Sequence, residues 1–234
     1  AYITTSDETG LYYTQTDGNG VFSYDADTRQ ITVTQGPVVM KTKGGLTVTA
    51  DEGASFAYSE TDKKLTFDGS ATVSSEGAAQ DRIEIDGTSV LKLDDVNIAP
   101  QKDGAGIAIK PGVTAVITLL DGTNNTVRGY GNYAGIEVGW DFGPILADLT
   151  INGNGSLTAF GGTNSAGIGG SKFNRGLYGN ITFGSLETKD NFTIQSTGNG
   201  GGAGIGSADN PNNGKSNGSY KYTDQNWGVI TFNS

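Results

Sequence analysis

Aromatic side chains stand beside acidic, amide and basic side chains in several loops of this chain. These loops lie at 136–149, 168–181 and 205–230, and a shorter equivalent lies at 107–117. An aromatic ring covers the apolar face of a pyranose while polar neighbours bind its hydroxyls, so the combination predicts a sugar-binding surface. The alternative is that the rings close small apolar clusters beneath long loops. The candidate ligand-binding residues are Tyr130, Tyr133, Trp140, Asp141, Phe142, Phe173, Arg175, Tyr178, Tyr220, Tyr222 and Trp227.

A second group that could do chemistry is acidic. When the strand-like phrases VLKLDD (90–95), VITLLDG (116–122) and DLTINGNG (148–155) are aligned with KLTFDGS, Asp68, Asp94 and Asn152 share one position. Asp95 and Asp121 share the next position. Ca²⁺ is bound by six to eight oxygens, so Asp94, Asp95 and Asp121 are candidate calcium ligands at a corner between neighbouring repeats. The alternative is that these aspartates only stabilise turns.

The composition excludes many kinds of catalysis. The chain has no cysteine and no histidine, which removes thiolate nucleophiles, Cys/His zinc sites and histidine bases. Its four arginines lack an acidic setting suited to a lyase, and no pair of carboxylates stands out as a glycosidase pair. We therefore expect no catalytic residue and no enzyme activity. The net charge of −10 disfavours nucleic acid and anionic membranes as partners.

A repeated phrase predicts the elements that carry these loops. Ala-Gly-Ile occurs at 105–107, 134–136, 166–168 and 203–205, at intervals of 29, 32 and 37 residues. Apolar residues alternate after each copy, as in Ile107/Ile109, which is the period of a half-buried strand. Glycine is abundant, at 38 of 234 residues, and fits many tight turns. The pattern predicts an all-β, right-handed, single-stranded parallel β-helix with few or no helices.

The same strand pattern occurs upstream in QITVTQG, GLTVTADEG and KLTFDGS, without the Ala-Gly-Ile phrase. We expect a single domain over 1–234, in which residues 1–60 form an N-terminal cap or irregular first coils. No transmembrane run or signal peptide is apparent, and the start at Ala1 suggests a mature or trimmed chain. Open ends of such an array expose unpaired backbone, which makes end-to-end self-association an expectation as well.

The run VLKLDDVNIAPQKDGAGIAIKPGVTAVITLLDGTNNTVRG resembles carbohydrate-binding, pectate-lyase-like parallel β-helix proteins from the surface of anaerobic Gram-positive bacteria. The SAGIGG and GAGIGS phrases are similar to the Gly-rich repeats of large surface proteins of these organisms. The resemblance covers about residues 80–210 and implies a secreted or cell-surface protein that binds a polysaccharide or cell-surface glycan, with calcium as the implied cofactor. We expect non-catalytic glycan binding or adhesion, and the alternatives are a structural, filament-forming surface subunit or a calcium-dependent polysaccharide lyase.

Overall fold

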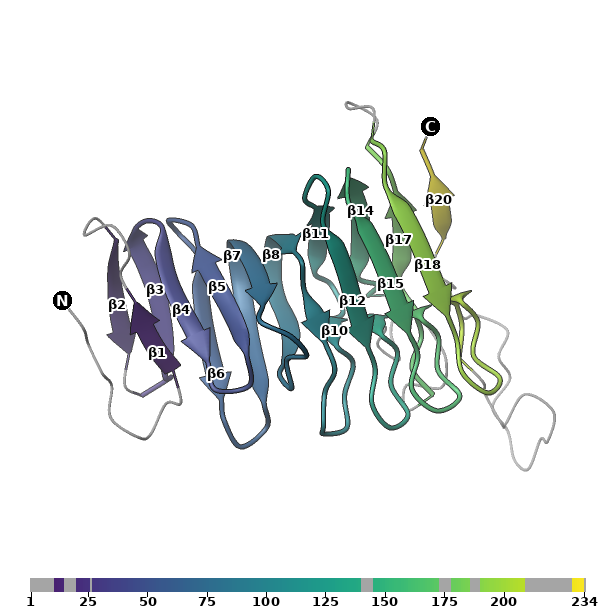
Figure 1. The fold of residues 1–234 in the computed structure, drawn as a ribbon, viewed down its shortest axis with the longest axis horizontal. Coiled ribbons are helices and arrows are strands. Elements are labelled where there is room, and N and C mark those ends of the chain that lie inside the picture. Colours follow the sequence, from purple (N-terminus) through teal and green to yellow (C-terminus); the bar gives the residue numbers. More distant parts are fainter. Residues whose placement is uncertain are drawn as a thin grey trace.

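A computed structural model describes residues 11–14, 20–25, 27–139, 145–172, 178–185, 190–208 and 229–233. Its strands lie side by side along the long axis of the molecule (Figure 1). The described residues contain strands, turns and bends but no helix, so the prediction of an all-β chain is confirmed. It follows that no helix in this part of the chain is long and apolar enough to cross a membrane.

The N-terminal strands are antiparallel. β5 lies opposite Ala71–Ser75 of β7 and continues through β4 to β1, whereas β6 lies opposite Lys64–Asp68 of β7 and continues through β3 to β2. The upstream phrases at 30–36 and 45–53 are therefore strands, but they are not parallel to the later repeats. Their bounds are β1 Leu11–Thr14, β2 Val21–Asp25, β3 Gln30–Gln35, β4 Val38–Thr42, β5 Leu46–Ala50, β6 Ser55–Ser59 and β7 Lys64–Ser75.

β7 and β8 (Arg82–Asp94) are long strands that pair in parallel over most of their length. The register shifts between Phe67 and Gly69, and Gly69 has a φ of +104°, a conformation that glycine adopts without a steric cost. This irregularity divides β7 into the two halves that pair with β6 and β5. β7 is thus antiparallel to its neighbours on one edge and parallel to β8 on the other.

Beyond β8 the strands form parallel series. One series runs β8–β10–β13–β16–β19, a second runs β8–β11–β14–β17–β20, and a separate four-stranded sheet has the order β18–β15–β12–β9. Their bounds are β9 Asn97–Ile98, β10 Ile107–Ile109, β11 Thr114–Leu119, β12 Asn124–Arg128, β13 Ile136–Val138, β14 Asp148–Gly153, β15 Ser156–Phe160, β16 Ile168–Gly169, β17 Asn180–Phe183, β18 Thr193–Thr197, β19 Ile205–Gly206 and β20 Ile230–Phe232.

The isoleucines of the repeated phrase lie in register, as their spacing predicts. Ile107 is opposite Ile83 and Ile136, and the series continues through Ile168 to Ile205. The first four are at most 1% exposed, so each packs beneath its neighbour in one continuous core. This row of apolar side chains is the main reason why such distant segments share a register.

The glycine of the phrase is required by close backbone approach. A β-carbon at Gly135 would lie 2.7 Å from the carbonyl oxygen of Gly167 and 2.8 Å from that of Phe160. Neither backbone oxygen can move without breaking its own hydrogen bond, since both accept from the neighbouring repeat. The loops that contain these glycines lie side by side at the lower edge of Figure 1.

A buried carboxylate joins the N-terminal strands to β8. Asp81 is fully buried, and it accepts one hydrogen bond from the Tyr58 hydroxyl (2.8 Å) and another from the Thr42 hydroxyl. Burial raises the pKa of Tyr58 far above its ordinary value, and the bond to the Asp81 carboxylate raises it further. A β-carbon at Gly44 would lie 1.9 Å from Asp81 Oδ1, so the carboxylate fills the space that an alanine would need.

Candidate functional site

One outward face carries a row of side chains from successive strands. In this row Ala57 is opposite Thr66, Thr66 is opposite Glu84, and Ala108 lies between Glu84 and Glu137. All five are half-buried and alternate with fully buried neighbours, because successive residues of a strand point to opposite faces. We name these five residues, together with Lys64, Asp68, Arg82, Asp86 and Lys110 beside them, the polar strip.

Ion pairs hold the middle of the polar strip. Glu84 Oε1 lies 3.1 Å from Lys64 Nζ and 3.3 Å from Lys110 Nζ, and Lys110 Nζ also lies 2.9 Å from Asp86 Oδ1. The hydrogen bond to Asp86 raises the pKa of Lys110, and the charge of Glu84 adds to this effect. Because both lysines are partly exposed, the pairs orient the side chains more than they stabilise the fold.

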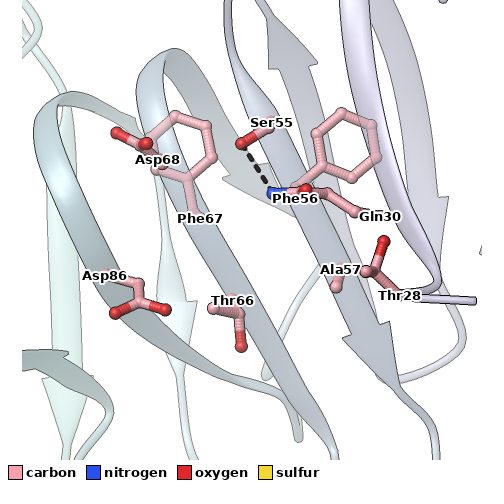
Figure 2. Close-up of a pocket in the computed structure, with 9 residues that line it drawn as sticks. All are labelled: Thr28, Gln30, Ser55, Phe56, Ala57, Thr66, Phe67, Asp68 and Asp86. Carbon is pink, nitrogen blue, oxygen red and sulfur yellow. Dashed lines mark hydrogen bonds between the residues drawn. The ribbon is translucent and has the colours of Figure 1, made fainter. Parts of the chain in front are cut away.

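A groove opens at one end of the polar strip, over β6 and β7 (Figure 2). It has a volume of about 400 Å³ and adjoins a second hollow of about 550 Å³ beside Arg29 and Glu60. Gln30 Nε2 donates a hydrogen bond to Ser55 Oγ across 3.0 Å. The groove is lined by Thr28, Gln30, Ser55, Phe56, Ala57, Thr66, Phe67, Asp68 and Asp86.

Hydroxyl, amide and carboxylate groups dominate the accessible lining of this groove. Phe56 and Phe67 are each only 1% exposed and point into the core, so they close its floor without presenting a ring face. A ligand in this groove would therefore meet hydrogen-bonding and charged groups, not an aromatic ring face. Its volume suits one or two sugar rings or another small polar group.

Two aspartates reach this groove from equivalent positions. Asp68 follows Phe67 in FDGS and Asp86 follows Ile85 in IDGTS, and Phe67 lies opposite Ile85. Asp86 is paired with Lys110. By contrast, no described residue forms an ion pair or a hydrogen bond with the carboxylate of Asp68, which rests against Gly87.

Tyr133 lies beside the polar strip, among charged groups. Burial raises its pKa, and the carboxylates of Glu137 and Asp103 raise it further, whereas the Arg82 guanidinium lowers it. Ser171 Oγ accepts a hydrogen bond from the Ala134 amide and donates one to Glu137. These contacts hold the loop between β12 and β13 against the strip.

Of the other predicted ligand-binding residues, the structure describes Tyr130 and Tyr178. Tyr130 is 48% exposed on the same loop as Tyr133, whereas Tyr178 is partly buried and packs against the core near Gly206. Of the predicted set, the structure thus places Tyr133 beside the strip, and Tyr130 lies on the same loop. Trp140, Asp141, Phe142, Phe173, Arg175, Tyr220, Tyr222 and Trp227 lie outside the described residues.

The predicted calcium ligands lie at a corner, but the alignment behind them was partly wrong. Asn152 is opposite Thr118, and Ser74 is opposite Asp94, so neither Asn152 nor Asp68 shares the position of Asp94. Asp95 has a φ of +52°, and its Oδ1 accepts a hydrogen bond from the Asn124 amide (2.8 Å), while Asp121 is exposed in the next turn. In the described residues no three acidic side chains come together as a metal site.

Sequence reasoning missed the groove. Its available signal was the recurrence of Asp-Gly followed by serine or threonine at 68–70 and 86–88, one repeat apart. Gln30 and Ser55 lie on antiparallel strands, Thr28 lies in the turn before β3, and none of the three carries a repeat signal. Comparison with protein families, with curated proteins and with solved structures finds no match to this chain.

Proposed function

We propose that the parallel series form a right-handed, single-stranded β-helix. Three strands recur in each repeat, one in each series, as in β10, β11 and β12 and again in β13, β14 and β15. The in-register isoleucines support this arrangement, because a coil that returns to the same place stacks like residues on one another.

On this scaffold we propose non-catalytic binding of a polysaccharide or cell-surface glycan. The observation that carries the proposal is the polar strip, a continuous outward row that crosses β6, β7, β8, β10 and β13 and ends in the groove. Four strand spacings of ~4.8 Å make the row roughly 19 Å long, which suits an oligosaccharide better than a single sugar. Tyr133 lies beside the row and Tyr130 is exposed on the same loop, so both can offer ring surface to the same ligand.

The location follows from the ligand. A protein that binds polysaccharide outside the cell is secreted or held at a bacterial cell surface, and we propose this location for the chain. Calcium remains a proposal for the corner of Asp94, Asp95 and Asp121, since carboxylates suit Ca²⁺.

Glycan-array binding, with and without Ca²⁺, tests the function, and a pair of blocking variants tests the surface. Ala108→Trp adds a bulky side chain in the middle of the polar strip, and we expect it to abolish binding. Thr158→Trp adds the same side chain to the outward face of β15, on the separate sheet, and serves as the matched control. Equal glycan binding by both variants and the unmodified protein would exclude the polar strip as the binding surface.

End-to-end self-association is the second candidate. At the C-terminal end of its series, Phe232 stacks on the buried Phe183 with ring centroids 5.1 Å apart, yet Phe232 is 71% exposed. A second copy that added its strands there would cover this ring. Sedimentation velocity over a range of concentrations should detect such assembly, and Phe232→Ser should abolish it. A monomer at every concentration contradicts this candidate.

A further inference from the structure

We propose that the groove over β6 and β7 binds an ammonium group, so that the preferred ligand is a polymer of amino sugars with free amines. This inference rests on the proposed glycan binding and adds the charge of the ligand. It concerns the groove at the end of the polar strip, which neither repeat pattern nor aromatic loop predicted.

The charged residues of the groove lining are all acidic. Asp68 and Asp86 contribute carboxylates, and none of the nine lining residues is a lysine or an arginine. Lys110 neutralises Asp86 at 2.9 Å, but no described cation lies within ion-pair distance of Asp68. A cationic ligand would therefore gain an ion pair at Asp68, whereas a uronate would place a like charge beside it.

The neutral groups of the groove complement an ammonium group. An ammonium carries three donors and no acceptor, so it requires several acceptors at one place. Ser55 Oγ already accepts from Gln30 Nε2, which leaves the side-chain carbonyl oxygen of Gln30 as a further acceptor in the lining, in addition to the Asp68 carboxylate. The hydroxyls of Thr28 and Thr66 line the same space and can accept from the ligand or donate to sugar oxygens (Figure 2).

Gly87 sets the position of the Asp68 carboxylate. A β-carbon at Gly87 would lie 2.2 Å from both Cγ and Oδ1 of Asp68. Because Asp68 is exposed, its side chain can rotate away from an alanine without leaving water. Gly87→Ala thus moves the carboxylate while it preserves the charge of the protein.

The experiment is a calorimetric titration with oligosaccharides of equal length made from glucosamine, N-acetylglucosamine, glucose or galacturonic acid. At neutral pH and low salt the unmodified protein should bind the glucosamine oligomer most tightly. Asp68→Asn should weaken this binding about tenfold, as expected for the loss of a charge-assisted hydrogen bond at an accessible site. The same variant should leave binding of the glucose oligomer unchanged, and Gly87→Ala should behave like Asp68→Asn.

Glu76→Gln is the matched control, because it removes the same charge from a side chain that is 88% exposed and outside the groove lining. It should bind all oligomers as the unmodified protein does, and circular dichroism should show that all three variants are folded. Equal affinity for glucosamine and N-acetylglucosamine oligomers, or no effect of Asp68→Asn, overturns the ammonium site. If the ammonium site fails in this way but the glucose oligomer binds the unmodified protein and not Ala108→Trp, the proposed glycan binding is still supported. If no oligomer binds, both the ammonium site and the proposed glycan binding are contradicted.

Discussion

Two glycines make similar contacts with an aspartate but should respond very differently to alanine. A β-carbon at Gly44 would lie 1.9 Å from a carboxylate oxygen of Asp81, and one at Gly87 would lie 2.2 Å from a carboxylate oxygen of Asp68. Neither glycine has a positive φ, so alanine introduces no backbone strain at either position. The difference lies in the aspartates, because Asp81 is fully buried and Asp68 is exposed.

The expected magnitudes follow from this difference. In Gly44→Ala the Asp81 carboxylate must move inside the core and lose a hydrogen bond from Tyr58 or Thr42. A lost hydrogen bond to a charged group costs about 1.5–3 kcal/mol, and overpacking costs about 1–3 kcal/mol. We therefore expect Gly44→Ala to lower the free energy of unfolding by roughly 3–5 kcal/mol, and Gly87→Ala to lower it by less than about 1 kcal/mol.

Guanidinium chloride unfolding followed by circular dichroism measures both variants against the unmodified protein. The slope of the transition should stay constant, so that the midpoint reports the change in the free energy of unfolding. The double variant Gly44→Ala/Asp81→Asn should be little more stable than Gly44→Ala alone, because the clash between the alanine and residue 81 is steric. If Gly44→Ala and Gly87→Ala unfold within about 0.5 kcal/mol of each other, burial of the aspartate does not decide the cost and the reasoning is wrong.

Three further predictions follow from the core and its glycines. The raised pKa of Tyr58 means that above about pH 10 the folded state keeps the phenolic proton while the unfolded state loses it. The free energy of unfolding should therefore fall above that pH by up to about 1.4 kcal/mol per pH unit. Tyr58→Phe should remove this contribution in alkaline denaturation, and an unchanged dependence of the free energy of unfolding on pH would contradict it. Ile136→Ala should cost about 3–5 kcal/mol and Ile205→Ala clearly less, because only Ile136 is fully buried; equal shifts in thermal unfolding would argue against the series of stacked isoleucines. Gly135→Ala should destabilise by about 3 kcal/mol or more because both contacts are backbone oxygens, and a melting temperature within experimental error of the original would contradict the close approach.

The parallel part of the fold could be predicted because its signal repeats. Ile107, Ile136, Ile168 and Ile205 each follow the same Ala-Gly pair, and Ile83 lies in register with them. A row of like apolar side chains has one arrangement that buries all of them. QITVTQG and GLTVTADEG show apolar residues at every second position, a pattern that parallel and antiparallel strands share. It could not indicate that β3 and β5 are antiparallel, since that depends on how the chain turns between strands.

The candidate site was less predictable, for two physical reasons. Both halves of the long strand β8 carry the same apolar alternation, so an alignment of phrases matched KLTFDGS with the second half and placed Asp68 with Asp94. Asp68 instead follows the Phe67–Ile85 pair and so corresponds to Asp86. The groove also takes Gln30 and Ser55 from strands outside the repeat. Tyr133 was predicted from its residue type and its place before the second Ala-Gly-Ile phrase, and its neighbours Arg82 and Glu137 lie on β8 and β13.

Because β7 pairs with antiparallel strands on one edge and with β8 on the other, we expect the strands to form in a definite order. The antiparallel partner β6 is close to β7 in sequence, so this pair closes its loop at little entropic cost, and we expect it to form early. Once β7 is in place, its free edge is a template on which β8 adds, and each later repeat adds to the one before it. A chain built in this way is completed from the amino-terminal side, and a break near β7 should be far more damaging than one near β20.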